Sequence, residues 1–193
     1  SNSGHVTGVE NKLLNQDTFE VLDLLPRSFT DLLILDPPYN LTKTFESATF
    51  RRRGLDEYGE WFEHLLVKLL RLLKDTASVY VCSEWYSSSA IHYALEKHLK
   101  VRNRITWERE KGRGAKRNWK NVSEDIWFAT VSDDYTFNVE DVKLKRRVLA
   151  PYTDVKGLAK DWEDSSDGQF RLTHPSNLWS DIKVPFWSLT ENT

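Results

Sequence analysis

Short apolar runs alternate with amphipathic stretches along the first half of the chain. Three runs are of strand length and are bounded by turn residues, which predicts buried strands. They are residues 12–15, 32–35 and 77–82. Apolar positions at helical spacing predict the intervening helices. These are the segment from the capping residue Asp17 to Pro26, residues 56–73 and residues 87–99. The alternating order predicts a doubly wound α/β sheet.

The pattern changes in the second half of the chain. Residues 101–108 and 124–131 are two further candidate strands with no helical pattern between them, which predicts an antiparallel hairpin at a sheet edge. Beyond about residue 139 regular periodicity fades, and a basic cluster around Arg146 precedes an acidic, loop-like segment. We therefore expect a core over residues 1–138 and a distinct region over residues 139–193.

The stretch Asp36-Pro37-Pro38-Tyr39 follows the run at 32–35. Two consecutive prolines neither continue a central strand nor open a helix cleanly, so the chain leaves the sheet in a stiff loop. That loop carries an acid, two backbone carbonyls and an aromatic ring at the carboxyl end of a strand. In open α/β sheets this is the edge at which ligands bind. An ordinary turn with a proline stop is the alternative interpretation.

At these residues the chain resembles the amino DNA methyltransferases, whose catalytic tetrapeptide reads Asp/Asn/Ser-Pro-Pro-Tyr/Phe. The resemblance implies methyl transfer from S-adenosylmethionine to an exocyclic base nitrogen, with catalytic roles for Asp36, Pro37, Pro38 and Tyr39. Asp36 and the Pro37 carbonyl would accept hydrogen bonds from the amino group, while Tyr39 would stack on the flipped base. The expected product is N6-methyladenine in double-stranded DNA. Cytosine N4 methylation is the alternative, and a truncated, inactive DNA-binding module is a third hypothesis.

The order of segments is similar to that of the beta class of this family and implies a Rossmann-like methyltransferase fold. It places cofactor contacts at Gln16, Asp17, Asp36 and Pro37. That class carries a glycine-rich cofactor motif near its carboxyl end, after the variable region, and no such motif stands behind a strand here. We therefore expect a fold that is incomplete at its carboxyl end. In the family fold, two further strands would separate the strand at 12–15 from the one at 32–35, supplied by a further segment or a second polypeptide. Association of two copies is a further expectation.

Basic residues interleaved with aromatic ones occur in two loops, a pattern that suits contacts to DNA phosphates and bases. We expect DNA contacts from Arg51, Arg52, Arg53, Trp107, Lys111, Arg113, Lys116, Arg117, Trp119 and Lys120. The alternative for both loops is a solvated surface with no ligand. By resemblance, residues 139–193 would include the target-recognition region and lead to the cofactor-binding segment.

Composition narrows the remaining possibilities. A net charge of −2 over 193 residues carries no global basic signal, so a nucleic-acid surface must be local. The single cysteine, Cys82, excludes an internal disulfide and suits a reducing cytoplasm. The family resemblance implies a bacterial or phage restriction-modification system as the setting. No histidine or cysteine spacing predicts a metal site, and no apolar run is long enough to predict a membrane span.

Overall fold

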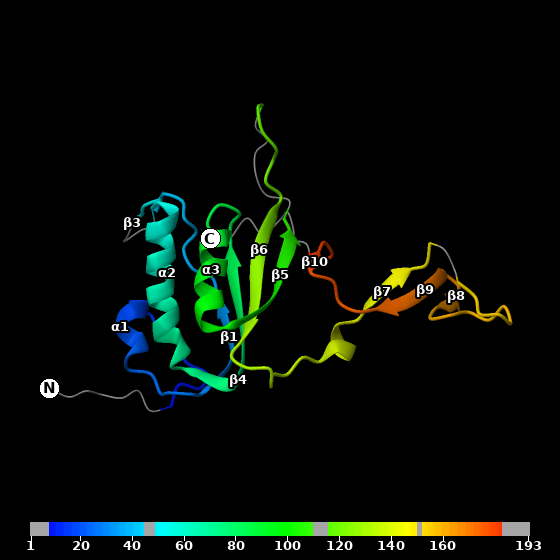
Figure 1. Cartoon of the computed structure of the whole chain (residues 1–193), viewed down its shortest axis with the longest axis horizontal. Helices are drawn as coiled ribbons and strands as arrows, with labels where there is room; N and C mark the ends of the chain where they lie inside the picture. The colour runs from blue at the N-terminus through cyan, green and yellow to red at the C-terminus, as the bar shows by residue number, and fades with distance from the viewer. Residues whose placement is uncertain (1–7, 45–48, 110–115, 150–151, 183–193) are drawn as a thin grey trace. The chain divides into compact units, whose positions relative to one another are not determined.

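The computed structural model describes residues 8–44, 49–109, 116–149 and 152–182. The chain divides into two compact units, each with its own sheet (Figure 1). Unit 1 contains the described residues up to Tyr135 together with those from Asn177 onward, and unit 2 runs from Thr136 to Ser176. The predicted second region, 139–193, therefore contributes its last described residues to unit 1.

A five-stranded mixed sheet forms the centre of unit 1, in the order β1-β4-β6-β5-β10. The strands are β1 (Thr30–Leu35), β4 (Leu73–Ser83), β5 (Lys100–Glu108), β6 (Ser123–Thr130) and β10 (Leu178–Trp179). β1 runs parallel to β4, whereas β6 lies between β4 and β5 and runs antiparallel to both. The predicted antiparallel hairpin is confirmed, but β10 pairs in parallel with β5, so the hairpin does not form the sheet's outermost edge.

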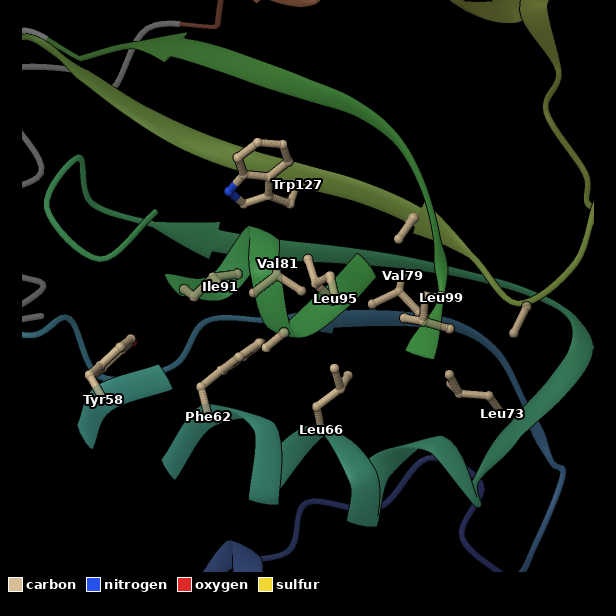
Figure 2. Close-up of a cluster of buried hydrophobic side chains, with 13 residues drawn as sticks. Tyr58, Phe62, Leu66, Leu73, Val79, Val81, Ile91, Leu95, Leu99 and Trp127 are labelled. Atoms are coloured by element: carbon tan, nitrogen blue, oxygen red, sulfur yellow. The ribbon is translucent and has the colours of Figure 1, made fainter. Parts of the chain in front are cut away.

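Three helices cover one face of this sheet, as Figure 1 shows. They are α1 (Thr18–Leu22), α2 (Leu55–Leu70) and α3 (Ser88–His98). Figure 2 shows the core between them, where Phe62 and Leu66 of α2 and Leu95 of α3 face Val79 and Val81 of β4. Among the described residues, helices therefore cover only one face of the five-stranded sheet. A doubly wound sheet has helices on both faces, so the described residues form one half of that predicted arrangement. No described helix is long and apolar enough to cross a membrane, α2 being 16 residues long.

The predicted strand at residues 12–15 is wrong. The backbone there is irregular, and Leu13 is 96% exposed. A strand forms only where a neighbour takes up its hydrogen bonds. Among the described residues β1 is the last strand on that side of the sheet, and residues 12–15 pair with no strand.

Two predicted helices are shorter in the structure. α1 ends at Leu22, and α2 ends at Leu70 rather than near residue 73. Arg71, the residue directly after α2, joins the two ends, because its guanidinium donates hydrogen bonds to the carbonyls of Leu22, at 2.5 Å, and Leu25, at 2.8 Å. Leu73 belongs instead to β4, where it pairs with Thr30.

Regular structure also occurs where none was predicted. The loop after Tyr39 contains a small antiparallel pair, β2 (Lys43–Thr44) and β3 (Thr49–Phe50). Unit 2 contains the 3-10 turn η1 (Val139–Val142) and a three-stranded antiparallel sheet of β7 (Leu144–Arg147), β9 (Gly168–Thr173) and β8 (Glu163–Ser165). None of the described residues of unit 2 is fully buried, so its side chains are largely accessible.

Candidate active site

The stretch Asp36–Tyr39 leaves the sheet at the carboxyl end of β1, beside the parallel strand β4. Leu33 and Leu35 point into the core, which fixes the direction in which the chain leaves the strand. Asp36 and Pro38 are exposed, Pro37 is buried and Tyr39 is half-buried. The predicted placement of an acid and an aromatic ring at the carboxyl end of a strand is thus confirmed.

The backbone of this loop is held by a buried tyrosine of α2. Tyr58 is 1% exposed, and its hydroxyl donates a hydrogen bond to the Pro38 carbonyl at 3.0 Å. Burial raises the pKa of Tyr58 to about 12, so the hydroxyl remains a donor at neutral pH. Among the described residues no hydrogen bond ends on the Pro37 carbonyl. The loop thus combines a Pro38 carbonyl bound by Tyr58 with a Pro37 carbonyl that accepts no hydrogen bond from the described residues.

Asn40 closes the loop that follows. Its fully buried side chain donates to the Arg53 carbonyl at 3.0 Å and accepts from the Arg53 backbone N–H at 2.8 Å. These two hydrogen bonds satisfy both ends of the amide and tie position 40 to position 53. The arginines at 51–53 are therefore attached directly to the end of the Asp36–Tyr39 stretch.

Tyr39 is attached to the sheet through its hydroxyl, which donates to Glu124 Oε2 at 2.7 Å. Burial, followed by this hydrogen bond, raises the pKa of Tyr39, so the phenol stays protonated. Glu124 also forms an ion pair with Arg109. Burial, together with the nearby carboxylates of Asp36 and Glu124, raises the pKa of the Cys82 thiol to about 11. Cys82 is thus a neutral thiol beside the site and no nucleophile.

The corner between β4 and α3 is fixed by the buried Glu84. Its carboxylate accepts hydrogen bonds from the backbone N–H groups of Tyr86, at 2.5 Å, and Ser87, at 2.9 Å. The Ser88 hydroxyl beside it donates to Asp125 at 2.5 Å and accepts from the Trp127 indole at 3.0 Å. Carboxylates at a helix start satisfy otherwise unpaired backbone donors. These hydrogen bonds hold the carboxyl end of β4, next to the Asp36–Tyr39 loop at the end of β1.

The predicted cofactor residues divide into two places. Asp17 is the N-cap of α1, with Oδ1 accepting from Phe19 N at 2.9 Å and from Glu20 N at 3.3 Å, which confirms its predicted capping role. Gln16 is exposed just before it. Asp36 and Pro37 lie at the end of β1. Among the described residues, no group of three acidic, histidine or cysteine side chains is placed to hold a metal ion.

The first set of predicted DNA contacts is partly engaged within the protein. Arg51 is exposed, whereas the Arg52 guanidinium lies 4.1 Å above the Tyr86 ring. Arg53 lies 5.5 Å from the Trp61 ring and 3.9 Å from a Glu57 oxygen. Arg51 and Arg52 are therefore the members of this triplet that best present their charge to solvent.

The second set lies around the β5–β6 hairpin. Trp107 donates from its indole N–H to the Ile182 carbonyl at 2.8 Å and is partly covered, so it is a packing residue in this structure. Lys111 and Arg113 lie outside the described residues. The remaining members of the set are exposed: Lys116, Arg117, Trp119 and Lys120. Trp119 is 94% exposed, which is unusual for an indole unless a partner covers it.

Three site residues escape prediction from sequence. Asn40 directly follows the tetrapeptide, so its place in the sequence could have indicated a role in the same loop. Tyr58 looks like any apolar-face residue of an amphipathic helix. Glu124 opens the predicted strand at residues 124–131, yet nothing local ties it to Tyr39.

Most of the chain matches one known protein family. The pattern of the family described as DNA methylase, of N6 and N4 type, matches residues 30–187, from the start of β1 through the tetrapeptide and unit 2. The chain belongs to this family of DNA methylases. Asp36–Tyr39, Glu124 and the basic hairpin all lie within the matched residues.

Two relatives illustrate how this DNA methylase compares with type II methyltransferases. It is 26% identical to M.BglII of Bacillus subtilis over 180 residues, which cover 88% of this chain and 48% of that protein. It is 30% identical to M1.MboII of Moraxella bovis over 137 residues, which cover 69% of this chain and 51% of that protein. The chain thus spans about half the length of the curated relatives it matches.

The fold also has a counterpart among solved structures. The cytosine-N4-specific PvuII DNA methyltransferase superposes with a TM-score of 0.58 over 88% of this chain and 55% of that one. Identity is 14%, so the likeness concerns the fold alone. It confirms the predicted α/β methyltransferase architecture.

Proposed function

We propose that this DNA methylase transfers a methyl group from S-adenosylmethionine to adenine N6 in double-stranded DNA, within a restriction-modification system. The observation that supports the proposal most is the Asp36–Tyr39 loop at the carboxyl end of β1, anchored through Tyr58 and Glu124. Membership of the family supplies the reaction class. The type II relatives support the biological setting.

The loop suits activation of an exocyclic amino group. The nitrogen's lone pair is delocalised into the base, so the amino group is a weak nucleophile. Two acceptors aimed at its hydrogens draw the nitrogen toward a tetrahedral geometry and stabilise the charge that develops on it. The exposed Asp36 carboxylate and the available Pro37 carbonyl are those acceptors in the proposal. The base must leave the duplex to reach them, and the Tyr39 ring offers a stacking face worth about 1–3 kcal/mol.

S-adenosylmethionine would supply the electrophilic methyl group. The described residues fit part of this cofactor. Exposed side chains of Gln16, Asp17 and Asp36 can hydrogen-bond to its amino groups, although Asp17 also caps α1. We propose that Gln16, Asp17, Asp36 and Pro37 contribute this part of the pocket.

A further segment or a second polypeptide would complete the pocket in this proposal. β1 is the last strand on its side of the described sheet, and its outward residues Leu32 and Ile34 are 53% and 68% exposed. An unpaired edge with exposed apolar side chains favours pairing with another strand. Strands added there would take up the unpaired backbone groups of β1 and border the end that carries Asp36, while elements packed on the open face of the sheet would cover Leu32 and Ile34.

DNA would be held by three basic surfaces, of which the Arg51–Arg53 triplet beside the loop is the first. The hairpin residues Lys116, Arg117 and Lys120 are the second, with Trp119 available for stacking.

The third basic surface lies within unit 2, where Arg146 and Arg171 are exposed and directly opposite each other on β7 and β9. Like charges placed opposite each other destabilise a sheet, and no ion pair among the described residues involves either arginine. A phosphate between them would relieve that repulsion, which supports unit 2 as the target-recognition region.

The base is the finer part of the proposal. Within the family, members acting on cytosine N4 more often begin the tetrapeptide with Ser, so Asp36 with Tyr39 favours adenine. Cytosine N4 is the second candidate, since the matched family includes both N6 and N4 types.

The test is to methylate DNA with the intact natural enzyme, digest it to nucleosides and separate them by mass. N6-methyladenine is expected. N4-methylcytosine in its place would establish the second candidate. DNA binding without either product would favour an inactive DNA-binding module.

A further inference from the structure

The hydroxyl of Tyr39 and the guanidinium of Arg109 are bound to the same carboxylate. Tyr39 donates to Glu124 Oε2 at 2.7 Å, and Arg109 Nη1 donates to Glu124 Oε1. Glu124 and Arg109 are largely covered, with side-chain exposures of 19% and 18%. Each oxygen of the carboxylate therefore has its own partner in a site that water reaches poorly. Charge-assisted hydrogen bonds of this kind are stronger than neutral ones.

Arg109 is itself fixed from three sides. Its guanidinium lies 4.7 Å over the Trp107 ring, and its backbone N–H donates to the Val122 carbonyl at 2.5 Å. Trp107 stands directly opposite Glu124 in the β5–β6 register. The ends of two strands thus hold the arginine, the arginine holds the carboxylate, and the carboxylate holds the tyrosine of the catalytic loop.

We propose that Glu124 is a positioning residue that orients the Tyr39 ring for the target base, and that Arg109 orients Glu124. This inference rests on the proposed function, because it assigns the ring its stacking role. Tyr39 lies outside the regular strand, so β1 pairing does not fix its side-chain torsions. A ring held at its hydroxyl presents one plane to an incoming base. A small displacement from the productive geometry lowers the rate of the reaction strongly.

The competing explanation is that Glu124 only closes the β5–β6 hairpin. The ion pair with Arg109 would suffice for that, since both residues stand where the two strands end. The other carboxylate oxygen of Glu124, Oε2, instead accepts a hydrogen bond from Tyr39. Tyr39 is 85 residues away in the sequence and lies on the loop after β1. Tyr39 remains protonated because burial and this hydrogen bond raise its pKa, so it acts as the donor at neutral pH.

A double-mutant cycle in the intact natural enzyme tests the inference, using Glu124→Ala, Tyr39→Phe and the combination. Tyr39→Phe keeps the ring and removes only the hydroxyl. Each single variant should lower kcat roughly tenfold, since hydrogen bonds to charged groups contribute at this level, with DNA affinity nearly unchanged. The double variant should be no slower than the slower single variant. Glu124→Gln should recover part of the rate, because its amide oxygen still accepts from Tyr39.

A spectroscopic readout separates orientation from folding. A fluorescent base analogue is placed at the target position, which is first mapped by sequencing of methylated DNA. Stacking on Tyr39 quenches its emission in the complex, so Glu124→Ala and Tyr39→Phe should both raise it. The control is Asp133→Asn, which breaks the ion pairs with Lys100 and Arg102 at the opposite end of the same two strands. It should change neither emission nor kcat.

The possible failures are distinguishable. Absence of methyl transfer by the unmutated enzyme would overturn the proposed function and this inference together. An active enzyme whose two single variants have additive effects on kcat, or whose Glu124→Ala form melts earlier without a change in emission, would overturn the positioning role alone. Glu124 would then be a hairpin residue.

Discussion

The Tyr58 hydroxyl donates a hydrogen bond to the Pro38 carbonyl at 3.0 Å, joining the first turns of α2 to the Asp36–Tyr39 loop. The loop's prolines cannot donate backbone hydrogen bonds, so little else of a regular kind could hold it. The buried tyrosine thus places the neighbouring Pro37 carbonyl and Asp36 relative to the helix layer. This hydrogen bond makes α2 part of the site.

Replacing Tyr58 with Phe should loosen that loop while keeping the core packed. We expect kcat to fall several-fold and unfolding stability to fall by about 1 kcal/mol, the usual contribution of one buried hydrogen bond. Steady-state kinetics and thermal melting would measure both. Tyr93→Phe, the same change at an exposed position of α3, is the matched control. Unchanged kcat in Tyr58→Phe would show that the loop is held without this bond.

The same residue predicts a dependence of stability on alkaline pH. Burial raises the pKa of Tyr58 from 10.0 to about 12. A group whose folded pKa is raised contributes stability below its unfolded pKa, and that contribution disappears as pH rises through the folded value. The stability difference between the unmutated protein and Tyr58→Phe should therefore shrink between about pH 10 and 12. Chemical denaturation at several pH values would measure it, and a constant difference would contradict the assignment.

Removing the Asp36 carboxylate should stop the chemistry without removing the DNA surface. Asp36→Ala should lower kcat about a hundred- to a thousandfold, as loss of one preorganised partner does, with DNA affinity within a few-fold of normal. Single-turnover methylation and equilibrium binding would separate the two effects. Asp31→Ala is the control, since this exposed carboxylate, paired with Lys74, stands at the other end of β1. Near-normal turnover in Asp36→Ala would remove the catalytic role.

Neutralising the hairpin loop should weaken binding to DNA of any sequence. We predict that changing Lys111, Arg113, Lys116 and Arg117 together to Gln flattens the slope of log affinity against log salt by about 0.9 for each DNA phosphate that is no longer neutralised. Titrations at several salt concentrations would measure the slope. A control variant removes lysines that form ion pairs elsewhere in unit 1, namely Lys68, Lys74 and Lys97. An equal slope in the loop variant and the unmutated enzyme would make the loop a solvated surface.

The paired arginines of unit 2 carry a separate prediction. Arg146→Gln and Arg171→Gln should each weaken DNA binding and together reduce the salt slope by up to about 0.9 if they share one phosphate. Either change should also stabilise the free protein slightly, because it removes repulsion across β7 and β9. Lys143→Gln is the control, since Lys143 is already paired with Glu140 at 2.7 Å. Unchanged DNA affinity in the double variant would contradict phosphate binding at this pair.

The local elements of unit 1 follow largely from the sequence. Helical spacing of apolar residues predicts α2 and α3, and the strand-length runs predict β1, most of β4 and the β5–β6 pair. The Pro-Pro pair predicts a stiff loop at the carboxyl end of β1, and the tetrapeptide predicts the family that the comparison shows. These inferences succeed because side-chain periodicity and the missing proline N–H are properties of neighbouring residues.

The tertiary structure alone decided how the Asp36–Tyr39 loop is held. Tyr39 and Glu124 are 85 residues apart, and Tyr58 and Pro38 are 20 apart, so no local pattern signals either hydrogen bond. The irregular course of residues 12–15 was equally hidden, because an apolar run becomes a strand only when a neighbouring strand accepts its hydrogen bonds. The sequence determines which secondary structure each segment can form. Pairing across the sheet determines which buried polar groups come within hydrogen-bond distance of each other. The Tyr39–Glu124 hydrogen bond, on which the proposed orientation of Tyr39 depends, is one result of that pairing.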